Sequence, residues 1–163
     1  MKAALKSEFG VGYGVAFTRR YAAPRELLFE LWTDPKHLAK WWGPKGFTNP
    51  VCEFEARAGG RIYIEMTAPD GTAYPMEGTV QEIVPPERLV LVCTCCGDDS
   101  GKPGIESVTT VTFHADGDGT RMELEARITK FEDFARDALA GMEQGWSETL
   151  DRLADRLADV AKQ

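Results

Sequence analysis

Two histidines, His37 and His114, are the side chains of this 163-residue chain whose ordinary pKa best suits acid–base chemistry near neutral pH. Nucleophilic catalysis needs a nucleophile beside such a base, and a third group that orients the base. His37 stands between Lys36 and Leu38 in a polar stretch, and His114 ends an apolar run before a turn. Neither histidine belongs to a catalytic motif. We therefore favour solvated positions for both histidines and assign no catalytic residues, so that an enzyme is the minority interpretation.

Four cysteines could bind a metal or undergo redox chemistry: Cys52, Cys93, Cys95 and Cys96. Thiolates are preferred zinc ligands, and three of the four are crowded into one apolar run. In an extended strand, however, Cys93 and Cys95 share one face while Cys96 points to the other, and the chain has no second Cys-x-x-Cys. We expect free thiols, no metal and no cofactor. A redox or thiol-reactive role stays open.

The overall charge excludes some classes of partner. Nineteen basic and 26 acidic residues give a formal net charge of −7, so no basic surface is expected to neutralise phosphates. We therefore expect no nucleic-acid partner and no membrane partner. The N-terminal residues lack an apolar core, and no stretch approaches 18 apolar residues, which favours a cytoplasmic protein. The length suits one domain over residues 1–163, with a core at about 11–160, as a monomer or homodimer.

Residues 131–161 predict one long amphipathic C-terminal helix. Apolar residues recur there at spacings of three and four: Met142, Trp146, Leu150, Leu153, Leu157 and Val160. Thr129 precedes Glu132 by three residues, the spacing of a capping box, which places the helix start there. Gly141 and Gly145 stand one turn apart, where they indicate either a kink or a close approach that leaves room beneath the helix.

The remaining chain predicts a strand, two short helices and about six further strands. The first strand covers residues 11–21, a short helix starts at Pro24, and Asp34-Pro35 opens a second helix through Trp41. Alternating apolar residues then predict hairpins at 51–66 and 105–129, and between them strands at 72–84 and 89–96. Pro75 and Gly78 indicate an edge or a bulge. The inward face of 89–96 stays open, because residues on both faces are apolar.

These elements predict an α+β fold. An antiparallel meander of six to seven strands would have one polar face and one apolar face, and the apolar face needs a cover. At about 1.5 Å per residue, the C-terminal helix is the only predicted element long enough to span such a sheet. The sheet and this helix should therefore enclose the core.

Several ordered motifs resemble a known family. They are Trp41-Trp42-Gly43-Pro44, Gly59-Gly60, Pro69-Asp70-Gly71, Glu82-Ile83-Val84-Pro85-Pro86-Glu87-Arg88-Leu89, and Gly145-Trp146 followed by leucines. Over residues 13–157 the chain is similar to the homologues of the activator of heat-shock protein 90 ATPase (AHSA-like), in the START-like (SRPBCC) helix-grip superfamily. The resemblance implies a curved sheet that grips the C-terminal helix, with an apolar cavity between them. It transfers the fold better than a co-chaperone activity, because the family's eukaryotic co-chaperones join this module to a further N-terminal domain, which we do not expect here.

The apolar inner surface supplies the candidate binding residues. We name Trp41, Trp42, Phe54, Ile64, Met66, Met76, Phe113, Met142 and Trp146. Methionines and aromatic residues suit an adaptable pocket, although a filled core would need the same residues. Of the two adjacent indoles, Trp41 and Trp42, we expect one in the core and one at the rim.

The sequence is compatible with three functional hypotheses. The leading hypothesis is non-enzymatic binding of a small hydrophobic or aromatic molecule in the cavity between sheet and helix. The alternative is a protein-interaction module that activates a chaperone (heat-shock protein 90) ATPase in the stress response. The third is a hydrolase or cyclase acting in the cavity, which the lack of a convergent polar motif weakens.

Overall fold

The computed structural model describes residues 5–162. Within them, seven strands form one antiparallel sheet in the order β1-β7-β6-β5-β4-β3-β2. The strands are β1 (Gly14–Tyr21), β2 (Thr48–Phe54), β3 (Arg61–Thr67), β4 (Ala73–Val84), β5 (Arg88–Cys95), β6 (Ile105–Asp116) and β7 (Gly119–Phe131). The strands from β2 to β7 follow one another as a meander, and β1 closes the row beside β7.

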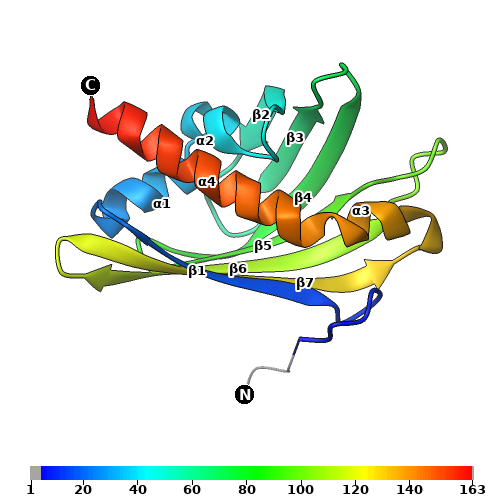
Figure 1. The fold of residues 1–163 in the computed structure, drawn as a ribbon, viewed down its shortest axis with the longest axis horizontal. Helices are drawn as coiled ribbons and strands as arrows, with labels where there is room; N and C mark the ends of the chain where they lie inside the picture. Colours follow the sequence, from blue (N-terminus) through cyan, green and yellow to red (C-terminus); the bar gives the residue numbers. More distant parts are fainter. Residues whose placement is uncertain (1–4, 163) are drawn as a thin grey trace.

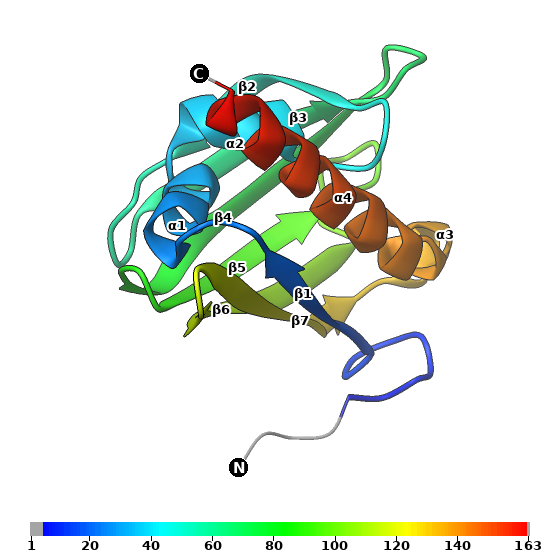
Figure 2. The same cartoon turned by 60° about the vertical axis from the view of Figure 1, so that its left-hand side comes forward.

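The helices lie on one face of this sheet. Helices α1 (Arg25–Thr33) and α2 (Pro35–Trp41) connect β1 to β2, and a 3₁₀ turn (Asp133–Ala135), α3 (Arg136–Ala140) and α4 (Met142–Ala161) follow β7. Figures 1 and 2 show α4 crossing the sheet diagonally, with α1 and α2 beside its C-terminal half. The predicted α+β helix-grip architecture is confirmed. In the described chain, no helix combines the length and apolar character needed to cross a bilayer.

The predicted start of the long helix is wrong. β7 stays paired with β6 as far as Phe131, opposite Ile105, so Thr129 lies in a strand. Its hydroxyl donates to the Glu106 carboxylate at 2.8 Å instead of capping a helix. Gly141 separates α3 from α4, which is the predicted interruption. Gly145 needs no close approach, because a Cβ there would lie 3.7 Å from Pro44 Cγ, an ordinary contact.

The structure also settles the strands that the sequence left open. Leu89, Leu91 and Cys93 of β5 belong to the hydrophobic core and define its inward face. β4 is an interior strand, not an edge, but its pairing with β5 begins only at Glu77 opposite Thr94. Pro75 therefore lies where β4 is paired on one side alone, opposite Glu65 of β3. That position tolerates a residue without an N–H group.

Arg152 of α4 joins the long helix to the chain after α2. Its Nη1 donates to the carbonyl oxygens of Trp42, Gly43 and Pro44 at 2.9, 3.0 and 3.1 Å. Its Nη2 donates to the carbonyl of Lys40 at 3.4 Å. One guanidinium thus satisfies carbonyl groups at the end of α2 and in the following loop, where the helix dipole favours a positive charge. This contact fixes where α4 lies relative to α2.

We expect Arg152→Ala to lower the free energy of unfolding by about 1.5–3 kcal/mol, because several hydrogen bonds to a charged donor are lost together. Denaturant unfolding measures the change. Arg136→Ala is the control, since the Arg136 ion pair with Asp133 is exposed and should contribute less than about 1 kcal/mol. Equal losses in the two variants would show that Arg152 does not hold the helices together.

Candidate functional site

All four tryptophans of the chain meet in one cluster. Trp32 of α1 lies 4.8 Å from Trp41 and 6.0 Å from Trp42, measured between ring centroids. Trp146 of α4 packs edge-on against Trp42 at 5.4 Å and stacks with Trp32 at 6.4 Å. Trp41 is fully buried, and its Nε1 donates to the Leu31 carbonyl at 2.9 Å. Trp42 is also buried, so the structure shows no exposed indole rim at this pair.

The apolar stripe of α4 changes in burial along the helix. Leu150, Leu153 and Leu157 are buried. Met142 and Trp146 continue the same stripe toward the N-terminus but stay partly exposed. The first seven residues of α4, 142–148, include no buried residue. The C-terminal half of the helix is therefore closed against the core, while its N-terminal half is less fully covered.

Small residues occupy the middle of the sheet's inner face. One row of directly opposed residues crosses six strands: Phe54, Ile62, Gly78, Cys93, Ser107 and Ile128. Gly78 has no room for a side chain, because a Cβ would lie 2.3 Å from the Val92 carbonyl oxygen. Ser107 shares the inward face of its partner Cys93 and yet stays partly exposed. Larger apolar residues, Ile62 and Ile128, thus flank a centre made of three small residues.

Partly exposed apolar residues gather at one end of the sheet. β3, β5 and β7 end there at Thr67, Cys95 and Phe131, and we call this the loop end. Met66, Cys95 and Phe131 pack against the core while keeping part of their surface exposed. The chain continues from β7 through α3 into α4, so α4, whose first residue is Met142, also begins at this end (Figure 1).

The structure brings most of the predicted binding residues together, but not all. Ile64 and Met76 are buried and opposite each other on β3 and β4. Phe54 is buried at the β2 side of the row of small residues. Phe113 is fully buried at the other end of the sheet, where its ring lies 5.6 Å from Phe29. Phe113 is therefore separated from the loop-end residues.

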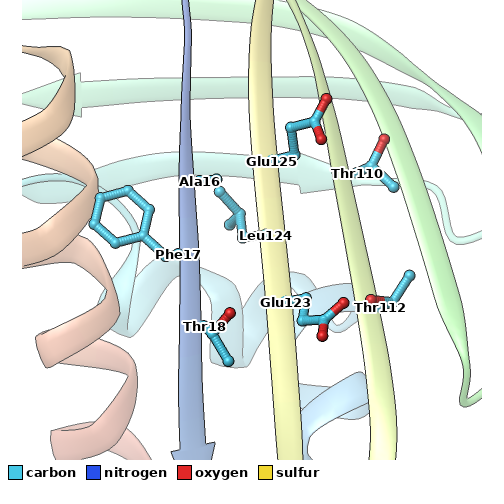
Figure 3. A pocket seen from close by; sticks show the side chains of 8 residues that line it. All are labelled: Ala16, Phe17, Thr18, Thr110, Thr112, Glu123, Leu124 and Glu125. Carbon is cyan, nitrogen blue, oxygen red and sulfur yellow. The ribbon is translucent and has the colours of Figure 1, made fainter. Parts of the chain in front are cut away.

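Two surface hollows lie on the opposite, outward face of the sheet. The first, of about 140 Å³, lies over β1, β6 and β7, and Figure 3 shows its lining of Ala16, Phe17, Thr18, Thr110, Thr112, Glu123, Leu124 and Glu125. The second, of about 280 Å³, is lined by residues of β3 to β6, among them Arg61, Glu77 and Thr94. None of the nine predicted binding residues lines either hollow.

Glu30, Asp34 and His37 form a polar group that the sequence pattern did not reveal. One ligand atom from each lies within 4.8 Å of the others. These atoms already have structural partners: an Asp34 carboxylate oxygen accepts from the Lys36 amide at 2.9 Å as the cap of α2. His37 Nδ1 contacts Arg156 Nη2 at 3.1 Å. The group therefore explains how α1, α2 and α4 are joined, and His37 is half-buried rather than fully solvated.

Sequence reasoning missed Gly78, Cys93, Ser107 and Thr109 as determinants of the interior. Their small size matters only once the strand register places them side by side, and no local motif encodes that register. The alternating pattern of β6 could have indicated that Ser107, Thr109 and Val111 share a face. It could not show which neighbours lie opposite them.

The change in burial along α4 predicts unequal effects for matched substitutions. Leu153→Ala should destabilise the protein by about 2–5 kcal/mol, as expected for a fully buried leucine. Met142→Ala removes a comparable side chain from the same stripe and should cost less than about 1.5 kcal/mol, since Met142 is only half-buried. Denaturant unfolding of both variants checks this. A core-sized loss for Met142→Ala would mean that the N-terminal half of α4 is as closely packed as the rest.

Comparisons with known proteins agree with this architecture. Residues 22–158 match the model of the family described as activator of Hsp90 ATPase homolog 1-like protein. A solved structure from Chromobacterium violaceum is 30% identical, with 87% of this chain and 94% of that chain covered and a TM-score of 0.75. No curated protein matches the sequence significantly.

Two further solved structures are similar over most of their length. One, from Rhodobacter sphaeroides, is 28% identical, with 90% of this chain and 93% of that chain covered and a TM-score of 0.72. The other is an AHSA1 protein from Silicibacter pomeroyi, 27% identical, with 89% of this chain and 97% of that chain covered and a TM-score of 0.76. Because the family model spans most of the sequence, the chain belongs to the family of activator of Hsp90 ATPase homolog 1-like proteins, in the START-like superfamily.

Proposed function

We propose that this protein binds a small hydrophobic or aromatic molecule, without transforming it, between the N-terminal half of α4 and the loop end of the sheet. One observation carries the proposal. The apolar stripe of α4 is buried at Leu150, Leu153 and Leu157 but only partly buried at Trp146 and Met142. Apolar side chains left partly uncovered in this way are typical of a binding surface.

The chemistry of the surrounding side chains defines the ligand class. Met66, Met142 and Phe131 offer apolar surface, and methionines adapt to ligands of irregular shape. Trp146 adds a partly exposed indole on which a flat ring can stack. Ser107 is a partly exposed polar group on this inner face, and its hydroxyl can donate or accept a hydrogen bond. We therefore favour a mostly apolar ligand, neutral or basic because the protein is acidic.

The positions of the histidines favour binding over hydrolysis or cyclisation. His37 lies between α2 and α4, against Arg156. His114 projects near Glu123 and Thr112, and both of these residues line the outward hollow. Of the two imidazoles, neither is among the loop-end residues. A general base for the proposed site would have to come from another type of side chain.

Ser107→Leu tests the proposal by filling the interior. If the interior beside Ser107 has room for a ligand, the larger leucine side chain should leave the free energy of unfolding within about 1 kcal/mol of wild type. It should also weaken binding of the neutral fluorescent probe N-phenylnaphthylamine by about tenfold or more, because the leucine takes the place of the probe. Fluorescence titration and denaturant unfolding supply the two readouts.

Thr110→Leu is the matched control, since Thr110 lies on the outward face of β6 and lines the first hollow. It should leave probe binding unchanged. If the interior is solid, Ser107→Leu should instead cost about 1–3 kcal/mol through overpacking, and folded wild-type protein should not bind the probe. That pair of results would contradict the proposal.

A chaperone-directed role is the second candidate, and the description of the matching family is what favours it. It predicts saturable stimulation of ATP hydrolysis by a heat-shock protein 90 relative from the same cell. We expect no stimulation, because the proposed ligand binding uses only residues between α4 and the sheet and needs no contact with another protein. Stimulation that survives Ser107→Leu would make a surface interaction the primary function.

A further inference from the structure

The end of β5 carries two adjacent thiols in an unusual arrangement. Cys95 and Cys96 are both free, and their Sγ atoms lie 2.7 Å apart. Successive residues of a regular strand point to opposite faces, which would separate the two sulfurs. Cys96 departs from the strand conformation with φ +61°, in the left-handed region. This backbone rotation brings its side chain to the side of Cys95.

The neighbouring loop holds Cys96 in this conformation. In the described residues, Cys96 is the one non-glycine residue with a positive φ, a conformation that costs free energy for most side chains. The Gly104 amide donates to the Cys95 carbonyl at 3.1 Å. A Cβ at Gly104 would lie 2.3 Å from the Cys96 carbonyl oxygen, so the chain after the loop packs directly on this residue. The pairing of the two sulfurs is thus built into the turn.

The two thiols differ in their electrostatic environment. Either thiol of the pair can donate to the other. With Cys95 as the donor, the contact raises the pKa of the Cys95 thiol and lowers the pKa of the Cys96 thiol below its usual value. Burial raises the pKa of Cys93 to about 12 and, with a contribution from Glu53, that of Cys52 to about 11. Cys96 therefore forms the thiolate most readily, and the thiolate is the form that reacts with oxidants.

We propose that Cys95 and Cys96 form a redox site that closes to a disulfide between adjacent residues when the protein meets a two-electron oxidant such as hydrogen peroxide. The Cys96 thiolate attacks one peroxide oxygen, giving a sulfenic acid and hydroxide. The Cys95 sulfur then attacks the Cys96 sulfur, the S–O bond breaks, and the hydroxide ions take up the protons as water. In sum, two thiols and one peroxide yield one disulfide and two waters.

The other thiols are less suited to this reaction. Cys93 and Cys95 share a face two residues apart, where an extended strand separates the Cα atoms by about 6.6 Å, near the upper limit for a disulfide. Cys93 is also buried, whereas Cys95 and Cys96 are partly exposed. Cys52 lies on β2, away from the end of β5. Cys95 is one of the loop-end residues, but the redox chemistry needs only the two sulfurs and an oxidant and does not depend on a bound ligand.

The test treats the full chain with hydrogen peroxide and follows it by intact mass and peptide mapping after alkylation. We expect a loss of about 2 Da in the monomer, as two hydrogens leave. After oxidation, alkylation should modify only two of the four cysteines. Treatment with dithiothreitol should make all four available for alkylation again. Cys95→Ser and Cys96→Ser should abolish the mass loss, whereas Cys93→Ser and Cys52→Ser should keep it.

Other products would overturn the proposal. They are a stable sulfinic or sulfonic acid on Cys96, a link between Cys93 and Cys95, and a disulfide between two chains. Loss of the reaction in Cys93→Ser protein would also overturn it. Should Cys96→Ser fail to fold, the linkage mapped in wild-type and Cys93→Ser protein decides the matter alone.

Discussion

The packing of four indoles at the junction of α1, α2 and α4 is the constraint on which the rest of the structure depends. Trp32 and Trp41 are fully buried, and Trp146 brings the long helix into contact with Trp32 and Trp42. Large aromatic surfaces of this kind contribute more burial than any other side chains. Because Trp146 lies one turn before Leu150, the cluster marks the point at which the apolar stripe of α4 changes from partly buried to buried.

The sheet complements this division. A row with Gly78, Cys93 and Ser107 at its centre crosses the inner face, and Ile62 and Ile128 in the same row are buried. Burial is complete for Trp32 and Trp41 of the indole cluster and for Leu150 and Leu153 of α4. At the loop end, Met66, Met142 and Phe131 pack against the core but keep part of their surface exposed.

Much of the fold could be predicted because local patterns encode it. The alternation of β2, β3 and β7 and the Asp34-Pro35 start of α2 act within a few residues and are reproduced in the structure. The start of the long helix could not be predicted, since the spacing of Thr129 and Glu132 also fits the end of a strand. In the structure β7 stays paired with β6 through this segment, and the Thr129 hydroxyl donates to the Glu106 carboxylate.

The candidate site was predictable in its apolar residues but not in its shape. Met142 and Trp146 follow from helical spacing, whereas the separation of Phe113 from them depends on strand register. The meeting of Cys95 and Cys96 depends on one backbone rotation that strand periodicity argues against. Long-range register and a single unusual φ angle are both properties of the folded chain, not of its local sequence.

Methyl NMR of the methionines offers the most direct view of the interior. Met66 and Met142 lie at the loop end, with Met76 on β4. Met122 is fully buried at the other end of the sheet, opposite Phe113. Titration with N-phenylnaphthylamine should shift the methyl signals of Met66, Met142 and Met76 in a saturable way and leave Met122 unchanged. Signals that do not move, or a shift at Met122 ahead of the other three, would contradict a ligand site beneath the N-terminal half of α4.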